Sequence, residues 1–268
     1  MRKNNRPLFA ALALLAGLSL GGAAQAQSFD AFRSYGAKIN EDGGTIGLGA
    51  IYANKYRGAK DHKGLVAPIL DYRWANGFFA GTRNGLGYDF SRSEGTAYGI
   101  RLTADTGRDQ DDDAHLRGLG DIKIRPEIGA FYNLALSHSI SFTSSLRYGS
   151  GNKQKGLVAD LGLSYNMPLA PQWVLGFGAG LSIVNSDYMQ DYFGVSAEQA
   201  KNSGLAAYEA KAGVRDVRAN VLLNHYLSKK AGVSVGISAG QLQGDAKNSP
   251  VTQKSSSYTA ILGYSYLF

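Results

Sequence analysis

The chain has 268 residues, with 35 glycines, 16 tyrosines, no cysteine and 18% charged residues. Glycine makes up about 13% of the chain, against an average of about 7%. The absence of cysteine excludes disulfides, thiolate metal sites and a cysteine nucleophile. The hydrophobic fraction of 44% is ordinary, which excludes a disordered or collagen-like chain.

The first 26 residues have the three parts of a secretory signal peptide. Basic residues precede an apolar run over 8–20, and the segment ends in the small residues Ala24-Gln25-Ala26. A retained membrane anchor is the alternative, but the run is short for a membrane span. Cleavage after Ala26 leaves 25 basic and 21 acidic residues, so the net charge falls from +7 to +4. We therefore expect an exported protein with no nucleic-acid partner and a periplasmic leader over 27–43.

From Gly44 onward, apolar residues alternate with small or polar ones. Residues 98–105, 122–133, 157–166 and 173–183 each follow this period of two, which indicates strands with one apolar face. A soluble sandwich would bury that face, whereas an outer-membrane barrel would turn it to lipid.

Three features favour the barrel. The strands are about 9–12 residues long, which suits a tilted membrane-spanning strand. Aromatic residues tend to end the apolar faces, as an interfacial girdle requires. These residues are Tyr52, Trp74, Tyr98, Tyr132, Tyr148, Tyr165 and Trp173. The last strand alternates Leu262, Tyr264, Tyr266 and Phe268, which resembles the recognition strand of outer-membrane barrels; a core strand is the alternative.

The pattern predicts a transmembrane antiparallel β-barrel over 44–268. Its expected strands are 44–53, 65–74, 77–82, 85–90, 97–106, 121–133, 139–149, 156–166, 172–184, 212–225, 232–240 and 256–268. The prediction is twelve strands, with ten possible if the hairpin at Arg83-Asn84-Gly85 lies outside the wall. Asn-Gly at that turn favours type I′ geometry.

Periplasmic termini would make the connections alternate between short turns and longer external loops. The expected external loops are 54–64, 83–84, 107–120, 150–155, 185–211 and 241–255. The expected periplasmic turns are 75–76, 91–96, 134–138, 167–171 and 226–231.

The candidate catalytic and metal residues are few. The acidic run over 108–113, with His115 nearby, could attract a divalent cation, but a solvated loop is favoured because the spacing lacks the pattern of an EF-hand. The histidines are His62, His115, His138 and His225. Ser137 and Ser139 flank His138 at a predicted periplasmic turn, which does not suit attack on outer-leaflet lipid. We therefore predict no enzyme, and no catalytic, cofactor-binding or metal residue.

Charged residues on the inward faces allow two interpretations. They could set the selectivity of a solute path, or they could fill the lumen as paired charges. They are Asp71, Arg73, Arg101, Asp105, Lys123, Arg125, Glu127, Arg147, Asp160 and Arg218. Aromatic residues also cluster without period two over 186–196. They could form an external binding surface, but packing on the barrel mouth is favoured.

The sequence resembles the MipA/OmpV family of outer-membrane proteins (MltA-interacting protein and relatives). The matching segments are Tyr56–Ala59, Pro68–Trp74, Tyr188-Met189, Tyr192–Ser196, Gly213–Asp216, Gly244–Ala246, Ser249–Val251 and Gly263–Phe268. Ala59 stands where a serine is common in the family.

The resemblance implies a barrel in the Gram-negative outer membrane that contacts lipid and is not an enzyme. In its namesake branch it implies a scaffold that links a lytic transglycosylase to a bifunctional penicillin-binding protein. The alternative is a narrow porin-like channel for small solutes that affects antibiotic or osmotic response. The short turns and the leader offer little surface for a scaffold, and the oligomeric state is open.

Overall fold

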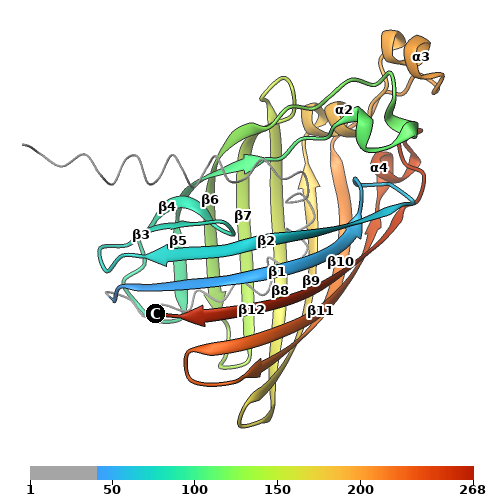
Figure 1. The fold of residues 1–268 in the computed structure, drawn as a ribbon. Helices are drawn as coiled ribbons and strands as arrows, with labels where there is room; N and C mark the ends of the chain where they lie inside the picture. Colours follow the sequence, from blue (N-terminus) through green and yellow to red (C-terminus); the bar gives the residue numbers. More distant parts are fainter. Residues whose placement is uncertain (1–40) are drawn as a thin grey trace, which may run out of the picture.

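Alternating residues build twelve strands within residues 41–268, the part of the chain that this computed structural model describes. The strands are β1 (Gly43–Asn54), β2 (His62–Arg73), β3 (Phe78–Gly81), β4 (Gly85–Asp89), β5 (Thr96–Asp105), β6 (Arg125–Ala135), β7 (Ile140–Ser150), β8 (Gly156–Ala170), β9 (Trp173–Val184), β10 (Gly213–Tyr226), β11 (Ala231–Leu242) and β12 (Ser256–Leu267). Chain neighbours pair antiparallel and β1 pairs with β12, so the sheet closes into a barrel (Figure 1). The prediction of twelve strands is confirmed, because β3 and β4 are part of the wall.

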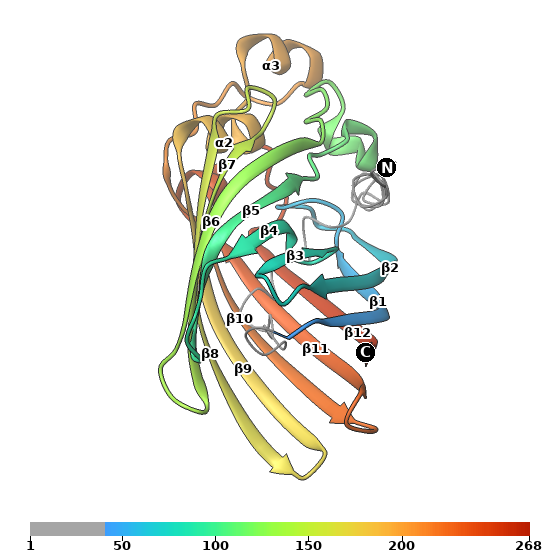
Figure 2. The same ribbon diagram turned by 90° about the vertical axis from the view of Figure 1, so that its left-hand side faces the viewer.

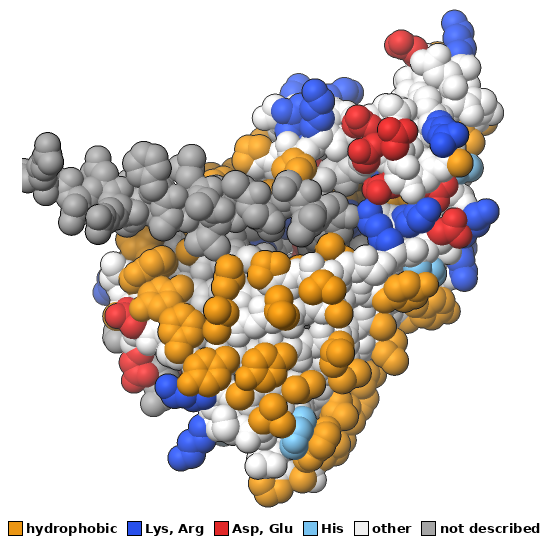
Figure 3. All heavy atoms as spheres, in the orientation of Figure 1, with side chains coloured by type: hydrophobic (Ala, Val, Ile, Leu, Met, Phe, Trp, Pro, Cys, Tyr) orange, Lys and Arg blue, Asp and Glu red, His pale blue; other side chains and the backbone are white. Residues whose placement is uncertain are grey.

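The outer face of the barrel is apolar. Val66, Ile128 and Ile237 are more than 60% exposed, although their side chains are of the kind that soluble proteins bury. Figure 3 shows hydrophobic side chains over the barrel wall and charged side chains gathered toward its ends. A wall of this kind is stable when lipid surrounds it, as in outer-membrane barrels.

Glycine allows the strands that close the barrel to approach one another. A Cβ atom on Gly47 of β1 would lie 2.0 Å from the carbonyl oxygen of Tyr264 on β12. No other residue type fits this position without moving the backbone. Part of the high glycine content is therefore a requirement of strand pairing.

The hairpin between β3 and β4 differs from its prediction. Three residues, Thr82 to Asn84, separate the paired residues Gly81 and Gly85. Gly85 has a φ angle of +74°, but Asn84 does not lie in the positive-φ region. The prediction of a type I′ turn is wrong, because that turn needs positive φ at both central residues, whereas a three-residue loop needs only the glycine.

The two short strands leave part of the wall unpaired. β3 pairs with β2 only at Asp71–Arg73, and one further pair of hydrogen bonds joins Leu70 to Thr82. β4 pairs with β5 only over 99–102. Within residues 41–268, no strand pairs with the outer half of β2 on this side, over 62–69. We call this segment the open edge of β2.

The alternation of backbone bonds identifies which groups the open edge exposes. Leu70 and Trp74 direct their backbone bonds toward β3, so the other even-numbered residues of β2 point the same way. Pro68 is one of them, and proline has no N–H group to leave unpaired. Gly64 and Val66 are the others with N–H groups in the middle of this edge.

Longer loops cover one end of the barrel, and the short turns lie at the other (Figures 1 and 2). The loops carry α2 (Ser186–Phe193), α3 (Ala197–Ser203), α4 (Gly244–Asn248) and two short 3₁₀ helices within 106–124. The turns are 74–77, 90–95, 136–139, 171–172 and 227–230. Outer-membrane barrels keep their short turns in the periplasm, so the looped end is external, as predicted. We call the packed loops the cap.

The start of β6 differs from its prediction. The predicted strand over 121–133 begins only at Arg125. Ile122 makes an isolated bridge with Arg108 and is 5% exposed among residues of the cap. Alternation suggested an outward side chain, but the chain leaves the wall here and buries Ile122 against α2 instead.

The predicted signal peptide (1–26) and most of the predicted leader (27–43) lie outside the described residues. They remain predictions. No helix among residues 41–268 is long and apolar enough to cross a membrane.

Candidate functional site: the lumen and its external mouth

A β-bulge in β10 places two neighbouring charged residues inside the barrel. The pairing between β9 and β10 shifts by one residue between Val214 and Asp216. Arg215 is the extra residue, so both Arg215 and Asp216 are buried while Val214 and Val217 face outward. Bulges re-aim side chains in this way.

The two residues join a network of three carboxylates and three guanidinium groups on the inner face of β6–β10. Nε of Arg215 lies 2.5 Å from Oδ2 of Asp216, and Arg218 also pairs with Asp216. Arg147 bridges Glu127 and Asp160, with N–O distances of 2.8 Å to each. Ser182 accepts bonds from Arg215 and Arg218 and donates one to Asp160. The charges balance, which keeps buried ions paired.

The aromatic residues of α2 tie this network to the cap. Nη1 of Arg215 donates to the hydroxyl of Tyr188 over 2.8 Å. The ring of Tyr188 stacks on Tyr192 with centroids 4.5 Å apart. The hydroxyl of Tyr192 donates to Asp105 at the end of β5 over 2.6 Å. Burial and the Asp105 charge raise the pKa of Tyr192 well above its ordinary value, so the phenol remains a donor.

The predicted aromatic loop packs on the barrel mouth. Tyr188, Met189, Tyr192 and Phe193 are each at most 5% exposed, and they contact a set of apolar residues from the barrel rim and α4. That set includes Val158, Val184, Leu242 and Ala246. Of the two interpretations, packing is confirmed for this segment.

The opposite inner wall carries apolar side chains and glycines. On β1 and β2 the inward residues include Gly47, Gly49, Ile51, Leu65, Ala67 and Ile69. A Cβ atom added to Gly49 would make only ordinary contacts, at 3.7 Å or more. The lumen therefore has a charged side and an apolar side.

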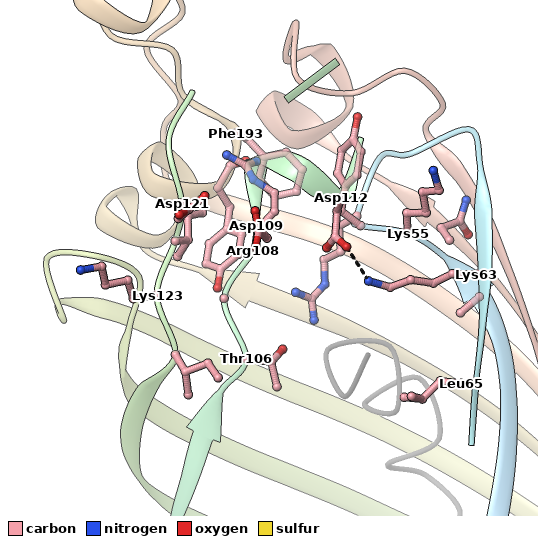
Figure 4. A pocket seen from close by; sticks show the side chains of 18 of the residues that line it. Lys55, Lys63, Leu65, Thr106, Arg108, Asp109, Asp112, Asp121, Lys123 and Phe193 are labelled. Atoms are coloured by element: carbon pink, nitrogen blue, oxygen red, sulfur yellow. Dashed lines mark hydrogen bonds and ion pairs between the residues drawn. The ribbon is translucent and has the colours of Figure 1, made fainter. Parts of the chain in front are cut away.

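A cavity of about 590 Å³ lies at the external mouth, where the apolar side of the lumen meets the cap (Figure 4). Its walls come from the outer ends of β1 and β2, the segment 106–124, and Tyr192 and Phe193 of α2. Nζ of Lys63 lies 3.0 Å from Oδ1 of Asp112, so this ion pair joins β2 to the facing segment (Figure 4).

The other predicted inward charges divide among local contacts. Asp71 pairs with Arg83 at 2.5 Å, and Arg73 pairs with Asp89 at 3.1 Å. Arg101 donates to Ser145 over 2.7 Å. Lys123 lines the cavity, and Nε of Arg125 has no hydrogen-bond partner among the described residues. These five residues and Asp105 lie outside the six-membered network.

The acidic residues of the predicted run over 108–113 stabilise the local backbone and an ion pair. Asp109 and Asp113 accept backbone N–H bonds that cap the two 3₁₀ helices, and Asp112 pairs with Lys63. Within residues 41–268, no group of three or more histidine or acidic side chains has the arrangement of a metal site.

His62, His115 and His225 contact partners other than serine in the described part of the chain. His62 stacks on Tyr52, and His225 stacks on Trp173 with centroids 4.0 Å apart. Nε2 of His115 lies 2.9 Å from the carbonyl oxygen of Pro250. Ser137, beside His138, accepts the N–H groups of Ser139 and Ile140 and so closes a turn.

Alternation alone missed Arg215, Asp216, Tyr188 and Tyr192 as partners in the lumen. The bulge breaks the period of two at Arg215, and the tyrosines reach the lumen from a helix. One signal in the sequence could have identified these residues. The helix residues and the bulge residues both belong to segments that carry the family resemblance.

A closed barrel with an apolar outer face, short turns at one end and a polar network inside defines an outer-membrane β-barrel. The family model described as "MltA-interacting protein MipA" matches residues 46–268. The chain belongs to this family, which confirms the resemblance, and it is a protein of the Gram-negative outer membrane.

Several solved barrels are similar to the chain in fold. The KdgM porin is 10% identical, with a TM-score of 0.44 over 83% of this chain and 98% of that chain. The NanC porin is 10% identical, with a TM-score of 0.43 over 82% and 98%. The Pseudomonas putida toluene transporter TodX is 12% identical, with a TM-score of 0.41 over 92% and 93%. No curated protein matches the chain.

Proposed function

We propose that the barrel is a non-enzymatic, narrow channel for small solutes, with its entrance at the cavity beside the cap. The observation that carries this proposal is the uneven lumen. The long charged side chains gather on β6–β10, while glycine, serine and threonine make up most of the inward faces of β1, β11 and β12. A twelve-stranded wall with one small-residue side leaves more room than a filled eight-stranded barrel.

Planar-bilayer recording with two adjacent variants tests this function. Gly49→Trp places a large side chain in the lumen, whereas Ala50→Trp places the same side chain on the lipid face of β1. We expect a steady conductance from the native protein, a clear reduction for Gly49→Trp and no change for Ala50→Trp. Conductance at the level of the empty bilayer, or equal conductance for the two variants, would refute the channel.

A second function rests on the family description. The family model is described as "MltA-interacting protein MipA". The resemblance implies a barrel that scaffolds murein-remodelling enzymes, a lytic transglycosylase and a bifunctional penicillin-binding protein. Among the described residues, the periplasmic turns are the surface open to such a partner. The turn over 227–230 is the most basic, with Lys229 and Lys230.

Co-purification tests the scaffold. Gentle extraction of the native protein should retain a lytic transglycosylase, and Lys229→Glu with Lys230→Glu should reduce its recovery if this turn takes part. Lys153→Glu, in an external loop, is the matched charge control. If native protein retains no murein enzyme, the scaffold function should be abandoned, whatever the bilayer recordings give.

A further inference from the structure

The cavity at the external mouth lies beside the open edge of β2. Lys63 and Leu65 of that segment face inward and line it, and Thr106 and Arg108 line it from the other side (Figure 4). In the described chain, the strand ladder is interrupted between these two walls. The cavity therefore lies where, among residues 41–268, the barrel wall between β2 and β5 lacks strand pairing.

Arg108 carries a buried positive charge without a described carboxylate partner. The residue is 8% exposed, and its Nη1 atom donates to the carbonyl oxygen of Tyr192 over 2.8 Å. Its Nε atom has no partner among residues 41–268. Burial lowers the pKa of Arg108, yet a guanidinium stays charged in proteins. An anion in the cavity would offset the free-energy cost of burying this charge.

The other charged residues of the cavity leave a cationic surplus. Its basic residues are Lys55, Arg57, Lys63, Arg108 and Lys123, and its acidic residues are Asp109, Asp112 and Asp121. Asp112 is paired with Lys63. Asp109 and Asp121 each accept a backbone N–H group, from Asp111 and Gln110. The acids are therefore engaged in local contacts, which favours an external anion as the partner of Arg108.

The remaining lining is apolar. Ile51 and Leu65 lie on the wall side, and Ile122, Ile124 and Phe193 on the cap side. A ligand that satisfies both kinds of lining has an anionic head and an apolar chain. A phosphate head fits several cations better than a carboxylate, because it carries up to two negative charges and accepts the guanidinium fork.

We propose that this cavity binds an amphiphile with a phosphate head, with Arg108 against the phosphate and Ile51 and Leu65 against the chain. The open edge of β2 gives such a molecule access from the membrane. This site does not require the barrel to conduct, so a failure of binding and an absence of conductance are separate results.

Calorimetry on the full-length protein in dodecyl maltoside micelles, which contain no phosphate, tests the head-group contact. The probes are dodecyl phosphate, inorganic phosphate and dodecanol, each measured against empty micelles. We expect saturable binding of dodecyl phosphate only. Arg108→Gln, which keeps a donor for Tyr192, should weaken it about tenfold or more, while Arg117→Gln, an exposed charge in the same segment, should leave it unchanged.

A second pair of variants tests the apolar contact without touching the charge. Leu65→Trp fills the cavity and should abolish binding, whereas Val66→Trp, the next residue on β2 but on the lipid face, should not. Equal affinity in Arg108→Gln and Arg117→Gln would overturn the site. Equal affinity for inorganic phosphate and dodecyl phosphate would overturn the amphiphile, since the chain would then contribute nothing.

Discussion

The hydroxyl of Tyr192 on α2 lies 2.6 Å from both carboxylate oxygens of Asp105, 87 residues away at the end of β5. This bond joins the cap to the wall on the side where β5 lacks a partner beyond residue 102. Through Tyr188 and Arg215 it also connects the cap to the charge network of the lumen.

Removing the Tyr192 hydroxyl should loosen the cap. Tyr192→Phe keeps the packed ring but deletes a buried bond to a charged group, which costs about 1.5–3 kcal/mol. We expect faster protease cleavage within 185–212 and a lower urea midpoint in detergent. Tyr226→Phe, at the periplasmic rim, is the matched control and should behave like native protein. If both variants resist protease equally, the bond does not hold the cap.

Removing Arg215 should destabilise the whole barrel. Arg215→Ala leaves Asp216 with Arg218 as its remaining guanidinium partner and removes a buried bond to Tyr188. Breaking a buried ion pair costs about 3–5 kcal/mol. The temperature at which the folded band shifts to the unfolded position on a gel should fall clearly. Arg117→Ala removes an exposed arginine and should change stability by at most about 0.5 kcal/mol. An unchanged shift temperature for Arg215→Ala would mean that the network is not structural.

The open edge of β2 should be visible in amide hydrogen exchange. The N–H groups of Gly64 and Val66 point to the unpaired side, while those of Leu65 and Ala67 bond to β1. We therefore expect exchange to alternate along 64–67, with the even residues faster. Leu70, whose N–H group donates to Thr82, is the internal control and should exchange slowly. Uniform protection over 64–67 would show that another segment pairs with this edge.

Alkaline pH should loosen the contact between the first external loop and residues 249–253. The hydroxyl of Tyr56 donates to the carbonyl oxygen of Val251 and accepts from Gln253, and burial raises the pKa of Tyr56 to about 12. Because the folded-state pKa is raised, the stabilisation is complete below about pH 10 and is lost as the pH rises toward about 12. Absorbance at 295 nm should show a late tyrosinate transition that Tyr56→Phe removes. A difference curve with its midpoint near pH 10, the ordinary tyrosine value, would contradict this assignment.

The alternation of side chains predicted the barrel, because each outward residue meets lipid and each inward residue meets the lumen. The strand number also depended on the turn at Arg83-Asn84-Gly85, and the orientation depended on the lengths of the connections. It failed where the backbone leaves that pattern. At Arg215 a bulge adds a residue, and at Ile122 the chain leaves the wall for the cap. The bond from Tyr192 to Asp105 depends on how the external loops pack on the barrel mouth. The open edge of β2 depends on which residues of neighbouring strands pair. The alternation of side chains contains no information on either.

Pro68 has a consequence for the surface of the barrel in a crowded membrane. An exposed strand edge is a template on which another protein can lay its own strand. On β2 such a strand would meet a proline ring in place of a donor near the inner end of the free segment. The same residue that leaves no orphan N–H group in lipid thus discourages intermolecular sheet growth, and this keeps the opening available to molecules that do not bind as strands.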